Sequence, residues 1–444
     1  MSYVDVAEIE HFVNNSILYK GYKQSSLKSL RDSQDHDLTS KLVRLSSQYL
    51  YFRNLNKLQD PNFFAGSVDF IIGEREGKRK FYVVEAQGTS GSYFSSLPQT
   101  FWQMANDSIL ESLLFTKSKK PFILITHPEE DEAYYEKFCV AQNLRQTFLS
   151  KGFDKCCLIG VEEISRKEKL GYPTIALGSY DDILPKLTAS KNRVFFDKNP
   201  IDMLIGSEVL SHLKKTTVRS TFIDSKTVIV NILCSVIDDR FLTYRAVDSI
   251  SDQLSTFEVE PMKWRVGYDF DDTVKAAENA LEEFDSIIIT PHGGGYFHGT
   301  ELISKLEDVR AKLRRSLRLF KNHDILKIDP YPYTISKTIE TGSALWHAAE
   351  PLFDIRVFIG RSGSRVLPLG AVLRVEDNLK DESQSLSDDR RSPGSSRFKG
   401  LSKETLNLIG LKEMDLTDIF SAGAHLITHM GNDLEEIIKG TVEG

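Results

Sequence analysis

The chain has 444 residues, of which 41% are hydrophobic and 27% charged, and its formal net charge is −7. This length predicts two or three domains, and the mildly acidic balance argues against a nucleic-acid-binding protein. The four cysteines lack CxxC or Cys/His ligand spacing, which argues against a zinc site and favours a reducing compartment. We find no signal peptide and no apolar run of about 18 residues, so we expect a soluble, cytoplasmic protein without a membrane partner.

Residues 68–92 have the pattern of a β-hairpin followed by a Gly/Ser/Thr loop. Its arms, VDFII and KFYVVEA, are rich in β-branched and aromatic residues. Alternation places Glu85 and Gln87 on one face, and a hairpin folded about residue 77 sets Asp69 opposite Glu85. Opposed carboxylates are unfavourable without a cation, and with an amide oxygen they form a ligand set that suits Mg²⁺. The alternative is an ordinary solvated face.

Two helical regions enclose this hairpin, and a different pattern follows it. Apolar residues at helical spacing predict helices within residues 1–60 and over 92–115. From residue 118 the order strand, turn, helix and strand predicts a βαβ unit, with strands FILIT and CCLIGVEEI and a helix over 133–149. The turn HPEED is not GxGxxG, so no dinucleotide site is predicted. TVIVNILCSVI then predicts another buried strand.

The stretch from residue 255 to 300 contains a glycine triplet. A helix over 270–284 leads into the strand SIIIT and then into Gly293, Gly294 and Gly295. Glycines after a buried strand let backbone amides approach a ligand closely, and phosphates are the usual ligand. We expect a helix to begin after Gly299 and to add its N-terminal dipole. A plain loop is the alternative.

A second hairpin is predicted nearer the C-terminus. ILKIDPYPYTI has the pattern of an extended connector, and RVFI, GRSGS and RVLPLGAVLRV then form a strand, a turn and a strand. If the hairpin folds near residue 365, Arg356 and Arg374 share a face. Two arginines without an obvious carboxylate partner suit a phosphate or carboxylate ligand. A solvated strand pair is the alternative.

The remaining C-terminal residues are a polar segment and a helical one. Residues 376–400 are rich in Ser and Asp and nearly free of large apolar side chains, which predicts a loop. The last segment is helical and places His425 and His429 four residues apart. No HExxH glutamate lies between them, so we expect a structural or surface role.

Taken together, these motifs resemble the ATP-grasp superfamily in a circularly permuted version, over roughly residues 60–375. The metal-binding hairpin that normally ends such a domain comes first here, and the phosphate loop and arginine hairpin follow in family order. The resemblance implies an α/β (α+β) ATP-grasp-like fold with a pre-ATP-grasp parallel lobe. The implied divisions are a metal-binding part with N-terminal helices, the parallel lobe, a nucleotide-binding part, a flexible loop and C-terminal helices, at residues 1–117, 118–250, 251–375, 376–400 and 401–444.

The resemblance also implies roles for individual residues. Asp69, Glu85 and Gln87 would bind Mg²⁺, and Arg356 and Arg374 would hold the transferring phosphate as catalytic residues. The nucleotide-binding residues would be Lys263, Thr290, His292, Gly293, Gly294, Gly295, Lys327 and Asp329. Two positions depart from the family pattern: Thr290 stands where a lysine is expected, and Gln87 where an asparagine is expected.

The implied activity is ATP-dependent amide-bond formation between a carboxylate, such as an amino acid or short peptide, and an amine through an acyl-phosphate. The implied cofactors are ATP and Mg²⁺, and no nucleic-acid partner is expected. Two alternatives stay open. One is an ATP-grasp-fold nucleotide-binding protein or kinase, which the neutral Thr290 supports. The other is a non-enzymatic α/β interaction protein.

Overall fold

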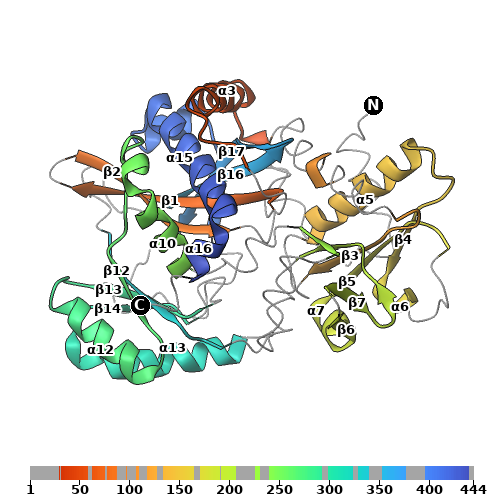
Figure 1. The fold of residues 1–444 in the computed structure, drawn as a ribbon. Coiled ribbons are helices and arrows are strands. Elements are labelled where there is room, and N and C mark those ends of the chain that lie inside the picture. The colour runs from red at the N-terminus through yellow and green to blue at the C-terminus, as the bar shows by residue number, and fades with distance from the viewer. Residues whose placement is uncertain are drawn as a thin grey trace.

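The chain is described here by a computed structural model (Figure 1). It contains a large mixed sheet, a parallel sheet, a small antiparallel sheet with two helices, and a three-stranded sheet. The residues that the structure describes are 30, 32–58, 63–75, 78–87, 97, 107–109, 118–127, 134–164, 171–190, 192–206, 226–230, 240–292, 299–323, 329–339, 353–376 and 396–439.

The largest sheet has six strands in the order β11-β2-β1-β16-β17-β18. All pairs are antiparallel except β11 with β2, and β1 brings the N-terminal hairpin against the C-terminal one by pairing with both β2 and β16. Both predicted hairpins are confirmed. The bounds are β1 Ala65–Arg75, β2 Lys78–Gln87, β11 Val259–Glu260, β16 Phe353–Ser362, β17 Arg365–Glu376 and β18 Ser396–Gly400.

The loop predicted over residues 376–400 is wrong at its C-terminal end. Residues 396–400 form β18 and pair antiparallel with β17. Strand formation here depends on a partner strand that the local composition does not reveal. Residues 377–395 lie outside the described part of the chain.

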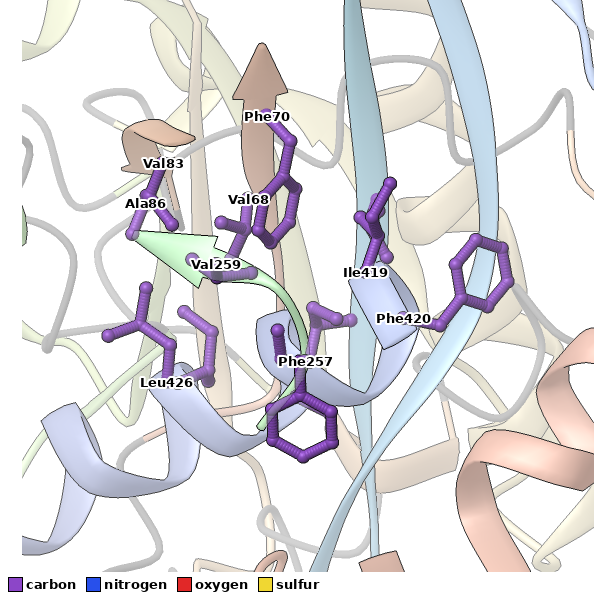
Figure 2. Packing of buried hydrophobic residues seen from close by; sticks show 14 of the residues in the cluster. Val68, Phe70, Val83, Ala86, Phe257, Val259, Ile419, Phe420 and Leu426 are labelled. Carbon is purple, nitrogen blue, oxygen red and sulfur yellow. The ribbon is translucent and has the colours of Figure 1, made fainter. Parts of the chain in front are cut away.

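One face of the large sheet is apolar because alternate residues of its strands point toward helices. Figure 2 shows Val68 and Phe70 of β1 in the same buried cluster as Phe420 and Leu426 of the long C-terminal helix. All four residues are fully buried. The helices that contribute to this cluster are α3 His36–Arg53, α10 Arg240–Ser249, α11 Ser251–Ser255, α14 Lys403–Leu408, α15 Glu413–Asn432 and α16 Leu434–Lys439.

The two histidines of α15 make structural contacts, as the sequence predicts. The Nδ1 atom of His425 lies 3.0 Å from the carbonyl oxygen of Leu55, and its Nε2 lies 2.6 Å from Oε1 of Gln253. His429 lies 2.7 Å from Asp433. These contacts tie α15 to its neighbours along the chain and in space.

Asp418 on α15 gives a testable pH dependence. Burial, followed by the charges of Asp415 and Glu258, raises the pKa of Asp418 to about 6. Such a carboxyl stabilises the fold fully below its ordinary pKa of 3.8 and loses this contribution as the pH rises through about 6. We therefore expect Asp418→Asn to stabilise the protein by about 1 kcal/mol at about pH 7.5, after allowing for solvent screening, and not at about pH 4. If the variant and the wild-type protein had the same melting temperature at about pH 7.5 as well as at about pH 4, the prediction would be contradicted.

The parallel sheet has the strand order β10-β9-β3-β5-β4. Figure 1 shows α5 on one of its faces and α6 and α7 on the other, so β3 is buried on both sides and is apolar nearly throughout. The bounds are β3 Phe122–His127, α5 Tyr134–Ser150, β4 Cys157–Gly160, α6 Val161–Ile164, β5 Thr174–Ser179, α7 Tyr180–Ile183, β9 Met203–Ile205 and β10 Val228–Ile229. A 3-10 turn at Leu184–Lys186 precedes the three-stranded sheet, whose strands are β6 Leu187–Ser190, β7 Arg193–Phe196 and β8 Asn199–Pro200.

The βαβ prediction is confirmed for β3, α5 and β4, and corrected at one end. The predicted strand CCLIGVEEI stops at Gly160, and VEEI forms the short helix α6. Its two glutamates occupy the first helical turn, where the helix dipole favours negative charge. The strand predicted from TVIVNILCSVI is described only at β10.

The small antiparallel sheet has the order β12-β15-β13-β14, with α12 and α13 packed on one face. The predicted helix over 270–284 and the strand before the glycines are confirmed as α12 and β13. Two expectations are corrected. The helix expected to begin after Gly299 is present as α13 but begins only at Val309, because ELI is strand β14 and pairs with β13. ILKIDPYPYTI, expected to be a connector, ends in strand β15, which pairs with both β12 and β13. The bounds are β12 Trp264–Gly267, α12 Phe270–Leu281, β13 Ile287–Thr290, β14 Glu301–Ile303, a 3-10 turn Leu306–Asp308, α13 Val309–His323 and β15 Tyr333–Lys337.

Among the helices of the described residues, none combines the length and apolar character needed to cross a bilayer. The helices predicted within residues 1–60 are confirmed for α3, whose N-cap Asp35 accepts a hydrogen bond from the backbone of Leu38 at 2.9 Å. Residues 1–29 and most of the predicted helix over 92–115 lie outside the described part.

Candidate active site

Three neighbouring strands of the large sheet place charged residues side by side on the face opposite the apolar cluster. Asp69 of β1 lies opposite Glu85 of β2 and, on its other side, opposite Arg356 of β16. The register of the first hairpin shifts between Asp69 and Phe70, so that Val84 is an extra residue on β2. This bulge lets Val83 point into the apolar cluster while Glu85 points away from it. The predicted opposition of Asp69 and Glu85 is thus confirmed.

Asp69 and Arg356 form a buried bidentate ion pair. The Nε and Nη2 atoms of Arg356 donate to Oδ1 and Oδ2 of Asp69 at 2.8 and 2.7 Å. The side chains are 1% and 7% exposed. Burial opposes the charge of the guanidinium, yet Asp69 and then Asp354 and Glu85 raise the pKa of Arg356 above its ordinary value. Arg356 is therefore held as a cation within a group of carboxylates.

This ion pair corrects one expectation. Arg356 does have a carboxylate partner, and the cation beside the opposed carboxylates is a guanidinium. The sequence of the first hairpin cannot reveal this, because Arg356 is 287 positions away from Asp69. Arg374 lies opposite Asp354, and Val372 lies opposite Arg356, so the register places both arginines on the same face, as predicted. The Arg374 side chain lies outside the described part.

Glu85 and Gln87 meet at the half-buried end of this row. The Gln87 amide nitrogen donates to Oε2 of Glu85 at 2.9 Å, and the amide oxygen of Gln87 is not used in that contact. Both side chains therefore offer the oxygen donors that Mg²⁺ takes. Asp69 fits a metal less well, because both of its oxygens bind Arg356. No group of three His, Cys, Asp or Glu side chains among the described residues has the arrangement of a metal site.

The glycine-rich loop joins β13 to β14 in the second sheet. Thr290 is the last residue of β13, and the backbone of His292 donates to the carbonyl oxygen of Pro330 at 2.8 Å. Gly299 has a φ of +80°, and a Cβ there would lie 2.9 Å from the carbonyl oxygen of Ser316. Glycine is required at this end of the loop. Gly293, Gly294 and Gly295 lie outside the described part.

The other predicted nucleotide-binding residues are more exposed. Lys263 lies between β11 and β12, close enough for its charge to act on Asp248. Burial raises the pKa of Asp248, and the hydrogen bond from Trp264 and the charge of Lys263 offset only part of that rise. Asp329 lies just before β15 and accepts from the backbone of Tyr331 at 3.1 Å. Its neighbour Pro330 contacts His292, so Asp329 lies at the loop end of the small sheet. Lys327 lies outside the described part.

Helix α10, which the sequence does not single out, links the two sheets. Thr243 accepts a hydrogen bond from the backbone of Ala86 on β2 at 3.2 Å. Arg240, at the first position of the helix, donates from Nη1 to Oγ1 of Thr290 at 3.1 Å. Tyr244 hydrogen-bonds Ser336 of β15, and its pKa is raised, first by burial. Arg240 belongs to no motif, so only the tertiary contact identifies it.

No protein-family model matches the chain, and no curated protein matches it in sequence. A putative gamma-glutamylcysteine synthetase from Methylobacillus flagellatus has a similar solved structure, with a TM-score of 0.50 and 13% identity, covering 94% of this chain and 98% of that one. A glutathione synthetase-like effector from Globodera pallida has a TM-score of 0.37 and 11% identity, covering 79% and 81%. D-alanyl-alanine synthetase A from Vibrio cholerae has a TM-score of 0.34 and 9% identity, covering 66% and 79%.

The last two similarities are below a TM-score of 0.5 and do not bear on the assignment. The first extends over nearly the whole of both chains, and at 13% identity it concerns the fold alone. The chain has a mixed α/β fold, with parallel and antiparallel sheets, that is similar to the fold of this solved structure. The predicted fold class is confirmed at this level, whereas the circular permutation and the domain boundaries stay predictions.

Proposed function

We propose that the chain is an ATP-dependent ligase that joins a carboxylate, such as an amino acid or short peptide, to an amine. The observation that carries the proposal is the row Glu85, Asp69 and Arg356 on the large sheet, joined through α10 to the base of the glycine-rich loop. The name of the similar Methylobacillus flagellatus protein, a putative gamma-glutamylcysteine synthetase, supports the same reaction class. We also propose that the ATP-grasp-like domain is circularly permuted.

In this proposal each part of the site has a separate task. Glu85 and Gln87 are the residues that would hold Mg²⁺, with Asp69 positioning Arg356 beside them. When bound, Mg²⁺ supplies charge neutralisation at the phosphate oxygens. Arg356 and Arg374 orient the transferring phosphate. The remaining nucleotide contacts are assigned to Lys263, Thr290, His292, Gly293, Gly294, Gly295, Lys327 and Asp329.

The chemistry needs positioning and charge neutralisation more than a nucleophilic side chain. An oxygen of the substrate carboxylate attacks the γ-phosphorus of ATP in line, forming an acyl-phosphate and releasing ADP. The amine then attacks the acyl carbon, and inorganic phosphate leaves. Guanidinium groups such as that of Arg356 offset the charge that develops on the phosphoryl oxygens. Holding both substrates in register supplies the rest of the acceleration.

The proposal predicts Mg²⁺-dependent nucleotide binding and amine-dependent turnover. The melting temperature should rise with millimolar ATP and Mg²⁺, and not with ATP and EDTA. ADP and phosphate release should then increase when pooled amino acids and amines are added, together with a new amide detected by mass spectrometry. Absence of any Mg²⁺-dependent shift would remove both nucleotide-based functions and leave a non-enzymatic interaction protein.

The second candidate is a nucleotide-binding protein or kinase without ligase activity. Thr290 favours this candidate, because its side chain is neutral where a lysine is expected, so β13 supplies no positive charge to the phosphates. The same assay separates the two. ADP release with a phosphorylated acceptor and no amide product identifies a kinase, and binding without ADP release identifies a binding protein.

A further inference from the structure

Two threonines face each other where the chain enters and leaves the glycine-rich loop. The antiparallel register of β13 and β14 pairs Ile289 with Glu301, and its continuation sets Thr290 opposite Thr300. Both side chains are buried, at 5% and 2% exposure. Because Ile287 and Ile289 point toward α12 and α13, alternation directs Thr290 and Thr300 to the other face of the sheet.

The hydroxyl group of Thr300 has no hydrogen-bond partner within the described residues. A buried hydroxyl without a partner is unfavourable, and native proteins rarely keep one unless a ligand or water takes the bond. Thr300 directly follows Gly299, whose left-handed backbone is needed at the same point. The base of the loop therefore holds a buried hydroxyl group whose hydrogen bond is not made within the described residues.

A fixed positive charge reaches the same place from another part of the chain. The guanidinium of Arg240 is buried, at 8% exposure, and donates to Thr290 at 3.1 Å. A guanidinium stays charged at any physiological pH and suits phosphate recognition. Its charge also lowers the pKa of Tyr244, on which Glu85 acts in the opposite direction. Arg240 thus lies at the base of the loop, on the helix whose Thr243 contacts β2 of the carboxylate row.

The position of Arg240 depends on both sheets. Its helix is fixed to β2 through Thr243 and Ala86, and to β15 through Tyr244 and Ser336. A cation held in this way needs no reorganisation when an anion arrives. Because α10 contacts β2 as well as β15, Arg240 has a set position relative to both the carboxylate row and the base of the loop.

We propose that Arg240, Thr290 and Thr300 form an anion site that binds the terminal phosphates of the nucleotide, with Arg240 as its cation. This inference rests on the proposed function, and it adds a charge that does not come from the strand carrying the loop. It accounts for how a loop preceded by a neutral threonine can hold a polyphosphate. The adenosine part of the nucleotide is not contacted by this site.

The test compares ATP, ADP and adenosine binding by calorimetry in the full-length protein with Mg²⁺. We expect Arg240→Gln to weaken ATP binding about 10- to 100-fold and leave adenosine binding unchanged, since a hydrogen bond to a charged group is lost. Arg240→Lys should retain most of the affinity. Arg245→Gln is the matched control, because it removes the same charge from the same helix about 140° around its axis.

Thr300→Val provides a second readout that does not depend on Arg240. It removes the unpartnered hydroxyl at constant volume, so it should raise the melting temperature of the nucleotide-free protein and still weaken ATP binding about tenfold. A structural threonine would show the opposite change in stability. The double variant Arg240→Gln with Thr290→Lys restores a cation at the loop and should recover ATP affinity.

The outcomes separate this inference from the proposed function. If the wild-type protein binds ATP with Mg²⁺, while Arg240→Gln and Thr300→Val bind it equally well, the anion site is refuted and the ligase proposal stands. If both variants lose ATP and adenosine in equal measure, the inference is also overturned. If the wild-type protein binds no nucleotide, both proposals fail.

Discussion

Replacing Arg356 with methionine is expected to lower the free energy of unfolding by about 3–5 kcal/mol. Methionine is unbranched, apolar and close to arginine in volume, so the loss is one of charge more than of volume. Without the guanidinium, the carboxylate of Asp69 stays buried at 1% exposure with its principal partner gone. Urea denaturation at neutral pH measures the change. The m-value, the dependence of the free energy of unfolding on urea concentration, should stay constant.

The same pair allows a double-mutant cycle. Asp69→Leu leaves the guanidinium of Arg356 unpaired and should cost a similar amount, whereas the double variant should lie within about 2 kcal/mol of the wild type or exceed it. The exposed pair Arg265–Glu283 is the control, with side chains 39% and 55% exposed. Arg265→Met should change stability by less than about 1 kcal/mol. Additive losses in the Arg356 and Asp69 variants would contradict a coupled pair.

The first hairpin could be predicted from the sequence because its determinants are local. Alternating apolar residues and the short separation of the strands predict the hairpin itself, but the register that ends at Phe70 and Val83 would set Asp69 opposite Val84, and only the bulge brings Asp69 opposite Glu85. The bulge at Val84 could not be predicted. It is needed because Val83 must enter the apolar cluster while Glu85 must leave it, and that requirement exists only once the helices are in place.

The partners of these residues could not be predicted, because they come from distant parts of the chain. Arg356 reaches Asp69 only through the pairing of β1 with β16, and Arg240 reaches Thr290 only through the packing of α10. Similarly, ELI at residues 301–303 has a pattern compatible with helix or strand, and its antiparallel pairing with β13 decides for the strand. Short apolar runs are ambiguous in this way until their neighbours are known.

The difference between Asp69 and Glu85 gives the prediction with the largest expected effect on activity. The two carboxylates lie directly opposite each other, but Asp69 is paired by a guanidinium and Glu85 is half-buried beside Gln87. If the ligase proposal holds, Glu85→Gln removes the charged oxygen donor for Mg²⁺. We expect Mg²⁺-dependent ADP formation to fall at least about 100-fold.

The stability of Glu85→Gln should change little, by about 0.5 kcal/mol, because the side chain is half-buried and the substitution preserves its shape. Higher Mg²⁺ concentrations should restore part of the activity, since the site keeps its amide oxygens. Glu283→Gln, which removes an exposed carboxylate just after α12, is the matched control and should retain full activity. Full activity of Glu85→Gln at an unchanged Mg²⁺ requirement would exclude Glu85 as a metal ligand. In that case activity would depend on the buried Asp69–Arg356 pair instead of on Glu85. Asp69→Asn would then reduce turnover as well as stability.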